Sequence, residues 1–388
     1  MIFNSKIVAT SKERVIGLDI LRSIAILLVM YEHGNSLLPP KILKYITLPR
    51  PSIDGVAIFF VLSGFLIGGI LLKIINTTEF TIKDLFNFWI RRWLRTIPNY
   101  YFILFILLLC QLFIAKDLGH INFKYFIFSQ NLYQAHPLFF PEAWSLSIEE
   151  WFYLTFPVLT YFLFKIIKDR NRSVLIAALF FLIIPLVLRI VKFYYFTGIP
   201  NWDLNFRKII VLRLDSLMYG IIGAYILTLK IEFWNKMKRT GLLISALLVL
   251  FLLIYSGLNI QKQAFECIYH YNLESIAVLF ALPYFSELKT IKLKKLAFLF
   301  TFISLISYSM YLINLTLIRD IAIPSINNLI GWHYGTNFFL NLTSHLFQFF
   351  LFWFLTIFFS YYLYLFIELP FMNLRNRLKF KIKQNKFN

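Results

Sequence analysis

The chain alternates between long apolar runs and short polar segments. A helix rises about 1.5 Å per residue, so a run of about 20 residues crosses a hydrocarbon layer of about 30 Å. The weakest of the apolar runs is the eighth, residues 273–288, because it is short and carries Glu274. The pattern predicts an all-α, polytopic membrane protein with about ten transmembrane helices. The predicted spans are residues 17–36, 54–75, 97–115, 148–167, 173–193, 209–230, 241–257, 273–288, 297–319 and 346–370.

Composition supports this interpretation and excludes other classes. With 59% hydrophobic and only 15% charged residues, the chain does not resemble a soluble domain. The net charge of +20 raises the question of a nucleic-acid partner. The positive residues are scattered through short loops between apolar runs, where membrane topology explains them. We therefore expect the lipid bilayer as surroundings and no nucleic-acid partner. Cys110 and Cys267 form neither a disulfide framework nor a metal-binding spacing, so no metal is expected.

The Lys and Arg residues in the loops and at the ends of the spans predict the orientation. One set of alternating segments, which includes both ends of the chain, holds 26 of them and the other set holds 10. Cytoplasmic loops carry the excess of positive charge, so both termini are expected in the cytoplasm. Residues 1–16 then form a cytoplasmic segment, 17–372 the membrane domain and 373–388 a basic cytoplasmic tail. No small-residue cleavage pattern follows the first apolar run, which favours a retained span in a cell (inner) membrane.

The first span carries two polar side chains, Arg22 and His33, with Asp19 one turn before Arg22. Eleven positions correspond to three helical turns plus ~20°, so Arg22 and His33 share one face and lie ~16 Å apart along the axis. A charge inside a membrane span costs at least a few kcal/mol and is usually functional. A snorkelling arginine and an interfacial histidine are the alternative.

Two further groups of charges lie beside apolar runs. Arg91, Arg92 and Arg95 occupy one helical turn on the cytoplasmic side, as a phosphate clamp or as an ordinary positive-inside cluster that binds lipid headgroups. Glu149 and Glu150 head the fourth span on the outer side. Adjacent carboxylates at an apolar boundary repel each other, so one interpretation has them share a proton. The other interpretation makes them favourable anions in the first turn of a helix.

Seven segments occur in an order that resembles the acyltransferase-3 family of integral membrane acyltransferases. They are Arg-x10-His in the first span, GVAIFFVLSGFLIG, RRWLRTIP, WSLSIEEWFYLTFP, RLDSLMYGIIGA, ISYSMYLINL and the terminal ELPF. The resemblance covers roughly residues 15–372. It implies ten helices, an acyl-CoA donor on the cytoplasmic side and transfer of the acyl group to a hydroxyl on the extracytoplasmic side. Many members of the family acetylate bacterial surface glycans, so the resemblance implies a glycan or lipid-linked saccharide as acceptor.

The resemblance also implies roles for individual residues. It maps the family's arginine and histidine onto Arg22 and His33, and its arginine cluster onto Arg91, Arg92 and Arg95. The glutamate block corresponds to Glu149 and Glu150, and the later Arg-x-Asp to Arg213 and Asp215. One departure is Asn314, which stands where family members often carry a ninth-span histidine. An asparagine there retains the ability to hydrogen-bond substrate.

The chemistry of acyl transfer fits these residue types. The phosphates of acyl-CoA stay at the cytoplasmic face with Arg91, Arg92 and Arg95, while Arg22 meets a deeper phosphate or a carbonyl of the pantetheine arm. A sugar hydroxyl needs a base, and an imidazole such as His33 titrates near neutral pH. A carboxylate is expected to orient that ring, with Glu149, Glu150 and Asp54 as candidates.

The remaining candidates support substrate or structure. The developing oxyanion needs donors, for which Trp144, Ser145 and Ser147 are available. Arg213 and Asp215 are expected to bond neighbouring helices, since side chains two apart on a helix do not face each other. Direct transfer and a covalent acyl-enzyme both remain open.

The competing function is a polytopic transporter or flippase, because intramembrane charges also mark substrate pathways. That class often shows inverted repeats with broken helices in both halves. Here the charged motifs concentrate in the first four spans and do not recur, which favours the acyltransferase.

Overall fold

The computed structural model describes residues 14–39, 43, 53–77, 80–113, 122–258, 263–330 and 338–377, and these ranges contain helices but no strand. The predicted all-α class is therefore confirmed. The helices are α2 (Ile16–Gly34), α4 (Gly55–Thr77), α5 (Ile82–Phe113), α6 (Ala143–Ile167), α7 (Arg170–Tyr194), α8 (Asp215–Leu229), α9 (Ile231–Gly257), α10 (His270–Glu287), α11 (Lys294–Ile313), α12 (Ile323–Ile330), α13 (Phe338–Leu363) and α14 (Leu369–Arg377). Short helical segments connect them: η1 (Asn35–Leu37), η2 (Phe123–Ile127), η3 (Asp203–Arg207), η4 (Ile210–Leu212), η5 (Phe265–Tyr269), η6 (Asn314–Ala322) and η7 (Tyr364–Glu368).

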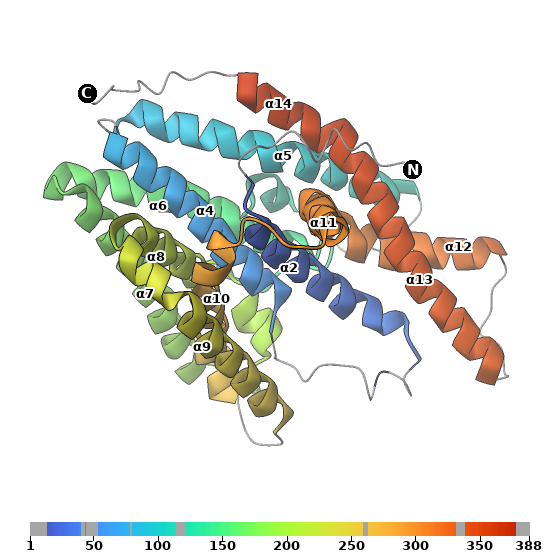
Figure 1. The fold of residues 1–388 in the computed structure, drawn as a ribbon. Coiled ribbons are helices and arrows are strands. Elements are labelled where there is room, and N and C mark those ends of the chain that lie inside the picture. Colours follow the sequence, from blue (N-terminus) through green and yellow to red (C-terminus); the bar gives the residue numbers. More distant parts are fainter. Residues whose placement is uncertain are drawn as a thin grey trace.

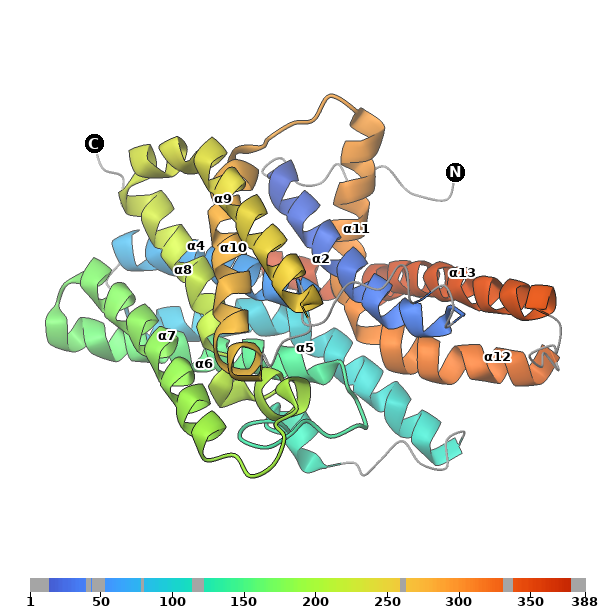
Figure 2. The ribbon, with the colours of Figure 1, turned by 90° about the horizontal axis from the view of Figure 1, so that it is seen from below.

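Helices α2 and α4 run through the middle of the bundle. Helices α7–α10 lie on one side of them and α11–α13 on the other (Figures 1 and 2). The most extensive helix pair is α4 with α8, and two glycines allow its backbones to touch. A Cβ on Gly64 would lie 1.9 Å from the carbonyl oxygen of Leu217, and one on Gly220 would lie 2.0 Å from that of Val61. Small residues permit this close approach of membrane helices.

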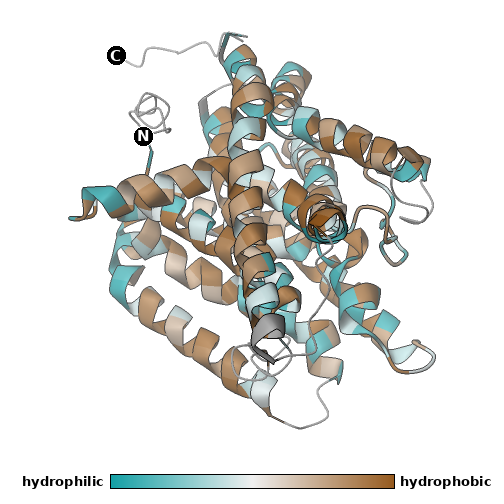
Figure 3. Ribbon diagram, turned by 90° about the vertical axis from the view of Figure 1, so that its right-hand side faces the viewer, coloured by the Kyte–Doolittle hydropathy of each residue, from teal (hydrophilic) through white to brown (hydrophobic). Residues whose placement is uncertain are grey.

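The bundle is apolar on its outside and holds many polar side chains inside. On α13, Phe350, Phe354 and Phe358 are 66%, 62% and 43% exposed and follow one helix face. Figure 3 shows the long helices predominantly in the colour of hydrophobic residues. Buried polar residues include Asp19, Glu150, Arg189, Arg213 and Asp215. This arrangement suits a lipid environment, since an exposed apolar surface of this size is unusual for a soluble monomer.

Seven helical stretches of the described chain are long and apolar enough to cross a membrane. They lie in α4, α5, α6, α7, α9, the run Lys294–Ile330 and the run Leu342–Arg375. The other three predicted spans coincide with α2, α8 and α10, which do not reach that length and hydropathy. Charges explain α2, which carries Asp19, Arg22 and Glu32, and α8 has only 15 residues. The structure thus supports a membrane protein and leaves the number of ten spans a prediction.

Several helix boundaries differ from the predicted ones. The fourth span was expected to start beside Glu149, but α6 begins at Ala143 and places this carboxylate in its second turn. The third span was expected to start at residue 97, after the arginine cluster, but α5 begins at Ile82 and continues through the cluster and through Pro98 as one helix of 32 residues. Polar residues concealed both helix starts, because they interrupt the apolar pattern.

The two ends of the described chain meet near the arginine cluster. Arg375, in α14, lies within electrostatic range of Arg95, and Arg14, before α2, lies with Arg95 within electrostatic range of Arg22. Residues 1–13 and 378–388, which make up most of the predicted terminal segments, lie outside the described residues.

Candidate active site

A cavity opens between α2, α4, α5, α6 and α11, and it encloses about 780 Å³ of empty space, part of it open to the outside. Its wall extends from Val56 to Leu66 along α4 and from Ser145 to Tyr153 along α6. At about 1.5 Å per residue, the cavity is therefore ~15 Å long.

One end of the cavity is cationic, and we call it the arginine end. Arg22 from α2 and both Arg92 and Arg95 from α5 line it. The Arg92 guanidinium lies 6.0 Å from the centre of the Tyr153 ring. The structure divides the predicted cluster, because Arg91 points to the exposed surface and is not part of the wall. A helix turns about 100° per residue, so neighbours such as Arg91 and Arg92 face different directions.

Glu149 lies in this cavity rather than beside His33. Its carboxylate accepts hydrogen bonds from the Ser63 hydroxyl at 3.0 Å and from the Tyr153 hydroxyl at 2.8 Å. It also lies within electrostatic range of Arg92 and Arg95. Three guanidinium groups and one carboxylate leave the arginine end net positive, as an anion site requires.

Glu150 points in another direction and is only 8% exposed. One of its carboxylate oxygens accepts a hydrogen bond of 2.8 Å from the Thr96 hydroxyl on α5. The other oxygen has no hydrogen-bond partner among the described residues. Glu149 and Glu150 thus join α6 to α4 and α5, and neither orients the His33 ring as the sequence suggested.

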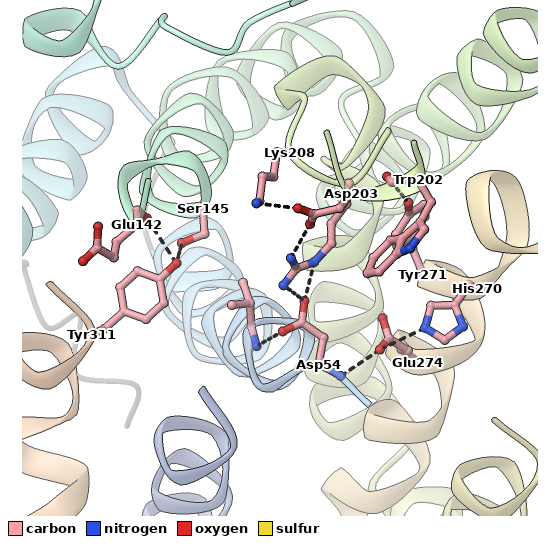
Figure 4. Close-up of polar contacts among 12 residues, drawn as sticks. Asp54, Glu142, Ser145, Trp202, Asp203, Lys208, His270, Tyr271, Glu274 and Tyr311 are labelled. Atoms are coloured by element: carbon pink, nitrogen blue, oxygen red, sulfur yellow. Dashed lines mark hydrogen bonds and ion pairs between the residues drawn. The ribbon is translucent and has the colours of Figure 1, made fainter. Parts of the chain in front are cut away.

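The opposite end of the cavity, which we call the tyrosine end, is closed by Tyr311 and Ser145. Their hydroxyl oxygens are 2.6 Å apart, and the Tyr311 hydroxyl also donates to the Glu142 carbonyl oxygen at 3.1 Å (Figure 4). The Phe59 ring packs edge-on to Tyr311, with centroids 6.3 Å apart. Ser145 therefore lines the cavity as a candidate donor should.

The other two predicted oxyanion donors do not line this cavity. Trp144 packs edge-on against Phe60, with ring centroids 5.9 Å apart. The Ser147 hydroxyl donates to the Ala143 carbonyl oxygen and accepts from the Gln130 side chain at 2.6 Å. Both residues fix the start of α6 and the loop before it.

His33 is held by Asn314, and this pair determines which ring nitrogen carries the proton. The Asn314 side-chain nitrogen donates to the carbonyl oxygens of Met310 and Tyr311, both at 2.9 Å. Its side-chain oxygen therefore faces His33, with 2.5 Å between this oxygen and Nδ1. Because an amide oxygen only accepts, Nδ1 carries the hydrogen and Nε2 keeps a free lone pair. The expected carboxylate partner is replaced by an amide whose own orientation is fixed by two backbone groups.

His33 does not line the cavity. It contacts Asn314, which lies one turn after Tyr311, the residue that closes the tyrosine end. The Tyr311 carbonyl oxygen receives one of the two Asn314 hydrogen bonds, and the Tyr311 ring forms the wall. Arg22 thus lies in the cavity wall, and His33 lies beside the tyrosine end through Asn314.

Asp54 belongs to a network of ions at the start of α4 (Figure 4). Its carboxylate accepts hydrogen bonds of 2.8 and 2.5 Å from Arg207, and Arg207 also bonds Asp203 at 2.7 Å. The Arg207 guanidinium lies over the Trp144 ring at 4.7 Å. Burial alone raises the pKa of Asp54, but the Arg207 charge outweighs this and holds that pKa below its usual value. A carboxylate so fully engaged is not free to orient His33.

Three predicted support residues occupy buried ion pairs or stacks. Asp215 pairs with Arg189 of α7 at 2.6 Å and not with Arg213, which agrees with the expectation that it bonds a neighbouring helix. The fully buried Arg213 guanidinium stacks 4.3 Å from the Tyr271 ring and has no hydrogen-bond partner in the described part of the chain. Asp19 is bonded by Arg14 and by the Ser304 hydroxyl and fastens α2 to α11.

Sequence reasoning missed Glu142, Arg189, Arg207 and Tyr311. Arg207 and Glu142 were treated as loop residues, although an arginine near the aromatic Trp202 and an acid before a helix are weak signals of burial. No group of three or more His, Cys, Asp or Glu side chains that suits a metal occurs among the described residues.

Comparison of the sequence with known protein families identifies the family of this chain. The family of acyltransferase domains matches residues 15–365, nearly the whole chain. The chain belongs to the acyltransferase-3 family. It is 32% identical over 228 residues to the O-acetyltransferase OatA of Staphylococcus aureus strain NCTC 8325, and the same values hold for OatA of strain COL.

The alignments cover 54% of this chain but only 34% of each relative, so the chain matches about a third of the length of these proteins. No solved structure matches the chain. Membership in the family identifies an acyltransferase domain and a membrane protein, in agreement with the resemblance of its motifs.

Proposed function

We propose that this acyltransferase-3 protein moves an acyl group, most simply acetyl, from cytoplasmic acyl-CoA to a hydroxyl of an extracytoplasmic glycan or lipid-linked saccharide. The observation that carries the proposal is the cavity, which joins three arginines to the Tyr311 segment that holds Asn314 and His33. The names of the relatives, O-acetyltransferases, support transfer of acetyl to oxygen.

The dimensions of the cavity fit the donor. The pantetheine arm joins the pyrophosphate of CoA to its sulfur through about a dozen bonds of about 1.5 Å, which gives ~15 Å when extended in zigzag form. The cavity has the same length. Phosphates at the arginine end, bound by the paired donors of guanidinium groups, therefore place the thioester beside Ser145 and Tyr311.

The reaction follows from the His33 tautomer. Nε2 accepts the proton of the acceptor hydroxyl while that oxygen attacks the thioester carbon. The carbon–sulfur bond then breaks, the sulfur leaves as a thiolate, and the imidazolium returns the proton to it. The products are an ester and CoA with a free thiol. In this structure the Ser145 hydroxyl donates to Tyr311, because Tyr311 itself donates to Glu142. During transfer the Ser145 hydroxyl turns to the carbonyl oxygen and stabilises the charge that develops there.

The membrane arrangement supports the same direction of transfer. The arginine end lies with Arg14 and Arg375, near both ends of the described chain, which the distribution of Lys and Arg assigns to the cytoplasm. His33 then lies toward the outer face of the cell (inner) membrane, where a surface glycan is accessible.

A test compares strains that lack the gene and carry either the wild-type chain or His33→Ala. Mass spectrometry of the surface glycans should show an acyl substituent with the wild type and none with the variant, at equal amounts of membrane-inserted protein. An unchanged glycan in the deletion strain contradicts the proposed acceptor. Normal acylation with His33→Ala removes this residue from the mechanism.

A further inference from the structure

Glu142 immediately precedes α6 and is almost fully buried, with 2% of its surface exposed. Its carboxylate accepts two hydrogen bonds from Thr316, one of 2.7 Å from the backbone nitrogen and one of 2.6 Å from the hydroxyl. A buried carboxylate is costly unless it is hydrogen-bonded, and here both of its oxygens are used. The two residues join distant parts of the chain, the loop before α6 and η6.

Thr316 lies where α11 changes into the π-helical segment η6 within one helical run, Lys294–Ile330. At Ile313 the backbone has φ −113° and ψ −16°, so its φ departs from the usual helical value of about −63°. Side chains bond backbone groups on both sides of this junction. The Asn314 side chain donates to the carbonyl oxygens of Met310 and Tyr311, and Glu142 accepts from the N–H of Thr316.

Glu142 also holds Tyr311 in place at the tyrosine end of the cavity. Its backbone carbonyl oxygen accepts the hydrogen bond from Tyr311, as Figure 4 shows, while its side chain points away from that ring. Glu142 thus contacts the chain on both sides of Asn314, at Tyr311 in α11 and at Thr316 in η6. Asn314 in turn bonds Nδ1 of His33.

We infer that Glu142 is a positioning residue for acyl transfer: its carboxylate fixes the junction between α11 and η6 so that Asn314 holds His33 in its productive tautomer and orientation. The inference rests on the proposed function, in which His33 is the base. The two bonds to Thr316 fasten the helical stretch around Asn314 to the start of α6. Without them this stretch is free to shift relative to α6 and α2, and the Asn314 amide shifts with it relative to His33.

A double-mutant cycle tests this relation with Glu142→Ala, Asn314→Ala and the combination. Misplacing a catalytic group by about 1 Å costs about 100-fold in rate, so each single variant should lower kcat by about 10- to 100-fold with little change in KM for the donor. If Glu142 acts through Asn314, the double variant is no slower than Asn314→Ala. Losses that multiply, or an equal rise in KM, overturn the inference.

Conservative variants separate positioning from general stability. Glu142→Gln keeps an acceptor for the Thr316 N–H and should retain most of the activity, and Thr316→Val keeps that bond as well. Thr160→Val is the matched control, because Thr160 is equally buried and its hydroxyl donates only within its own helix. The acid limb of the pH–rate profile should move with Glu142→Ala and remain in place with Thr160→Val. An unmoved limb argues against positioning.

A second measurement does not need activity and distinguishes this inference from the proposed function. His33→Cys and Asn314→Cys are combined in a background with Cys110→Ser and Cys267→Ser, and a short bis-methanethiosulfonate reagent joins the two cysteines. We expect rapid cross-linking with Glu142 present and at least a tenfold slower reaction with Glu142→Ala. Equal rates overturn the inference even if acyl transfer is confirmed, and a slowed reaction supports it even if no acceptor is acylated.

Discussion

Removing single arginines from the predicted cluster tests whether the cavity binds the donor. Arg92 and Arg95 line the cavity, whereas Arg91 lies in the same helical turn and is exposed. We expect Arg95→Gln and Arg92→Gln to weaken binding of CoA and Arg91→Gln to leave it unchanged. The sequence treats the three residues alike, so only the structure makes this distinction.

The magnitude follows from the location of the charges. A hydrogen bond between charged groups in a partly desolvated site contributes about 1.5–3 kcal/mol. At about 1.4 kcal/mol for each factor of ten, the loss of one guanidinium raises Kd by about 10- to 150-fold. An exposed charge such as Arg91 contributes less than about 0.5 kcal/mol, which is about twofold, and salt reduces it further.

The assay is titration of the purified protein in detergent or nanodiscs with CoA, by calorimetry at two salt concentrations. Thermal unfolding of each variant without ligand serves as the control for folding. The reasoning is refuted if Arg91→Gln weakens binding as much as Arg95→Gln does. In that case a general positive potential at the membrane surface, and not the cavity, attracts the nucleotide.

Three further predictions concern stability. Gly64→Ala forces a methyl group against the carbonyl oxygen of Leu217 and should cost at least about 2 kcal/mol in thermal unfolding, whereas Gly69→Ala, with nothing within 4 Å, should be neutral. Burial raises the pKa of Glu142 to about 7, from its ordinary value of 4.5. The folded state therefore holds this proton longer than the unfolded state, so stability falls as the pH rises from 4.5 through 7, and Glu142→Gln should flatten that dependence. Arg207→Gln leaves the buried Asp54 carboxylate without its cation and should destabilise by about 3–5 kcal/mol, which a Tm unchanged from wild type would contradict.

The apolar runs were sufficient to predict an all-helical membrane protein, because a span in lipid must satisfy its backbone hydrogen bonds within itself and be apolar outside. The residues at which helices begin were harder to predict. Ser145 and Ser147 face inward in the first turns of α6, and the first turns of α5 carry exposed charges such as Lys83 and Arg91. Hydropathy therefore placed the starts of α6 and α5 too late along the chain.

Periodicity also brought Arg22 and His33 to one face, and the motif order identified the family before the comparison did. The sequence could not show that Arg92 lines the cavity and Arg91 does not, since that depends on which helices surround α5. Nor could it find Arg207, which approaches Asp54 across 153 positions of sequence.

The sequence alone determined the fold class, the membrane environment and the types of side chain that the chemistry uses, since these depend on local hydrophobicity and on residue identity. The tertiary structure alone decided the partners: Asn314 rather than a carboxylate for His33, Arg189 rather than Arg213 for Asp215, and a cavity that joins Arg22 to Tyr311. The physical reason is that hydrogen bonds and ion pairs act over about 3 Å, and the groups that come so close belong to helices whose packing no local pattern encodes.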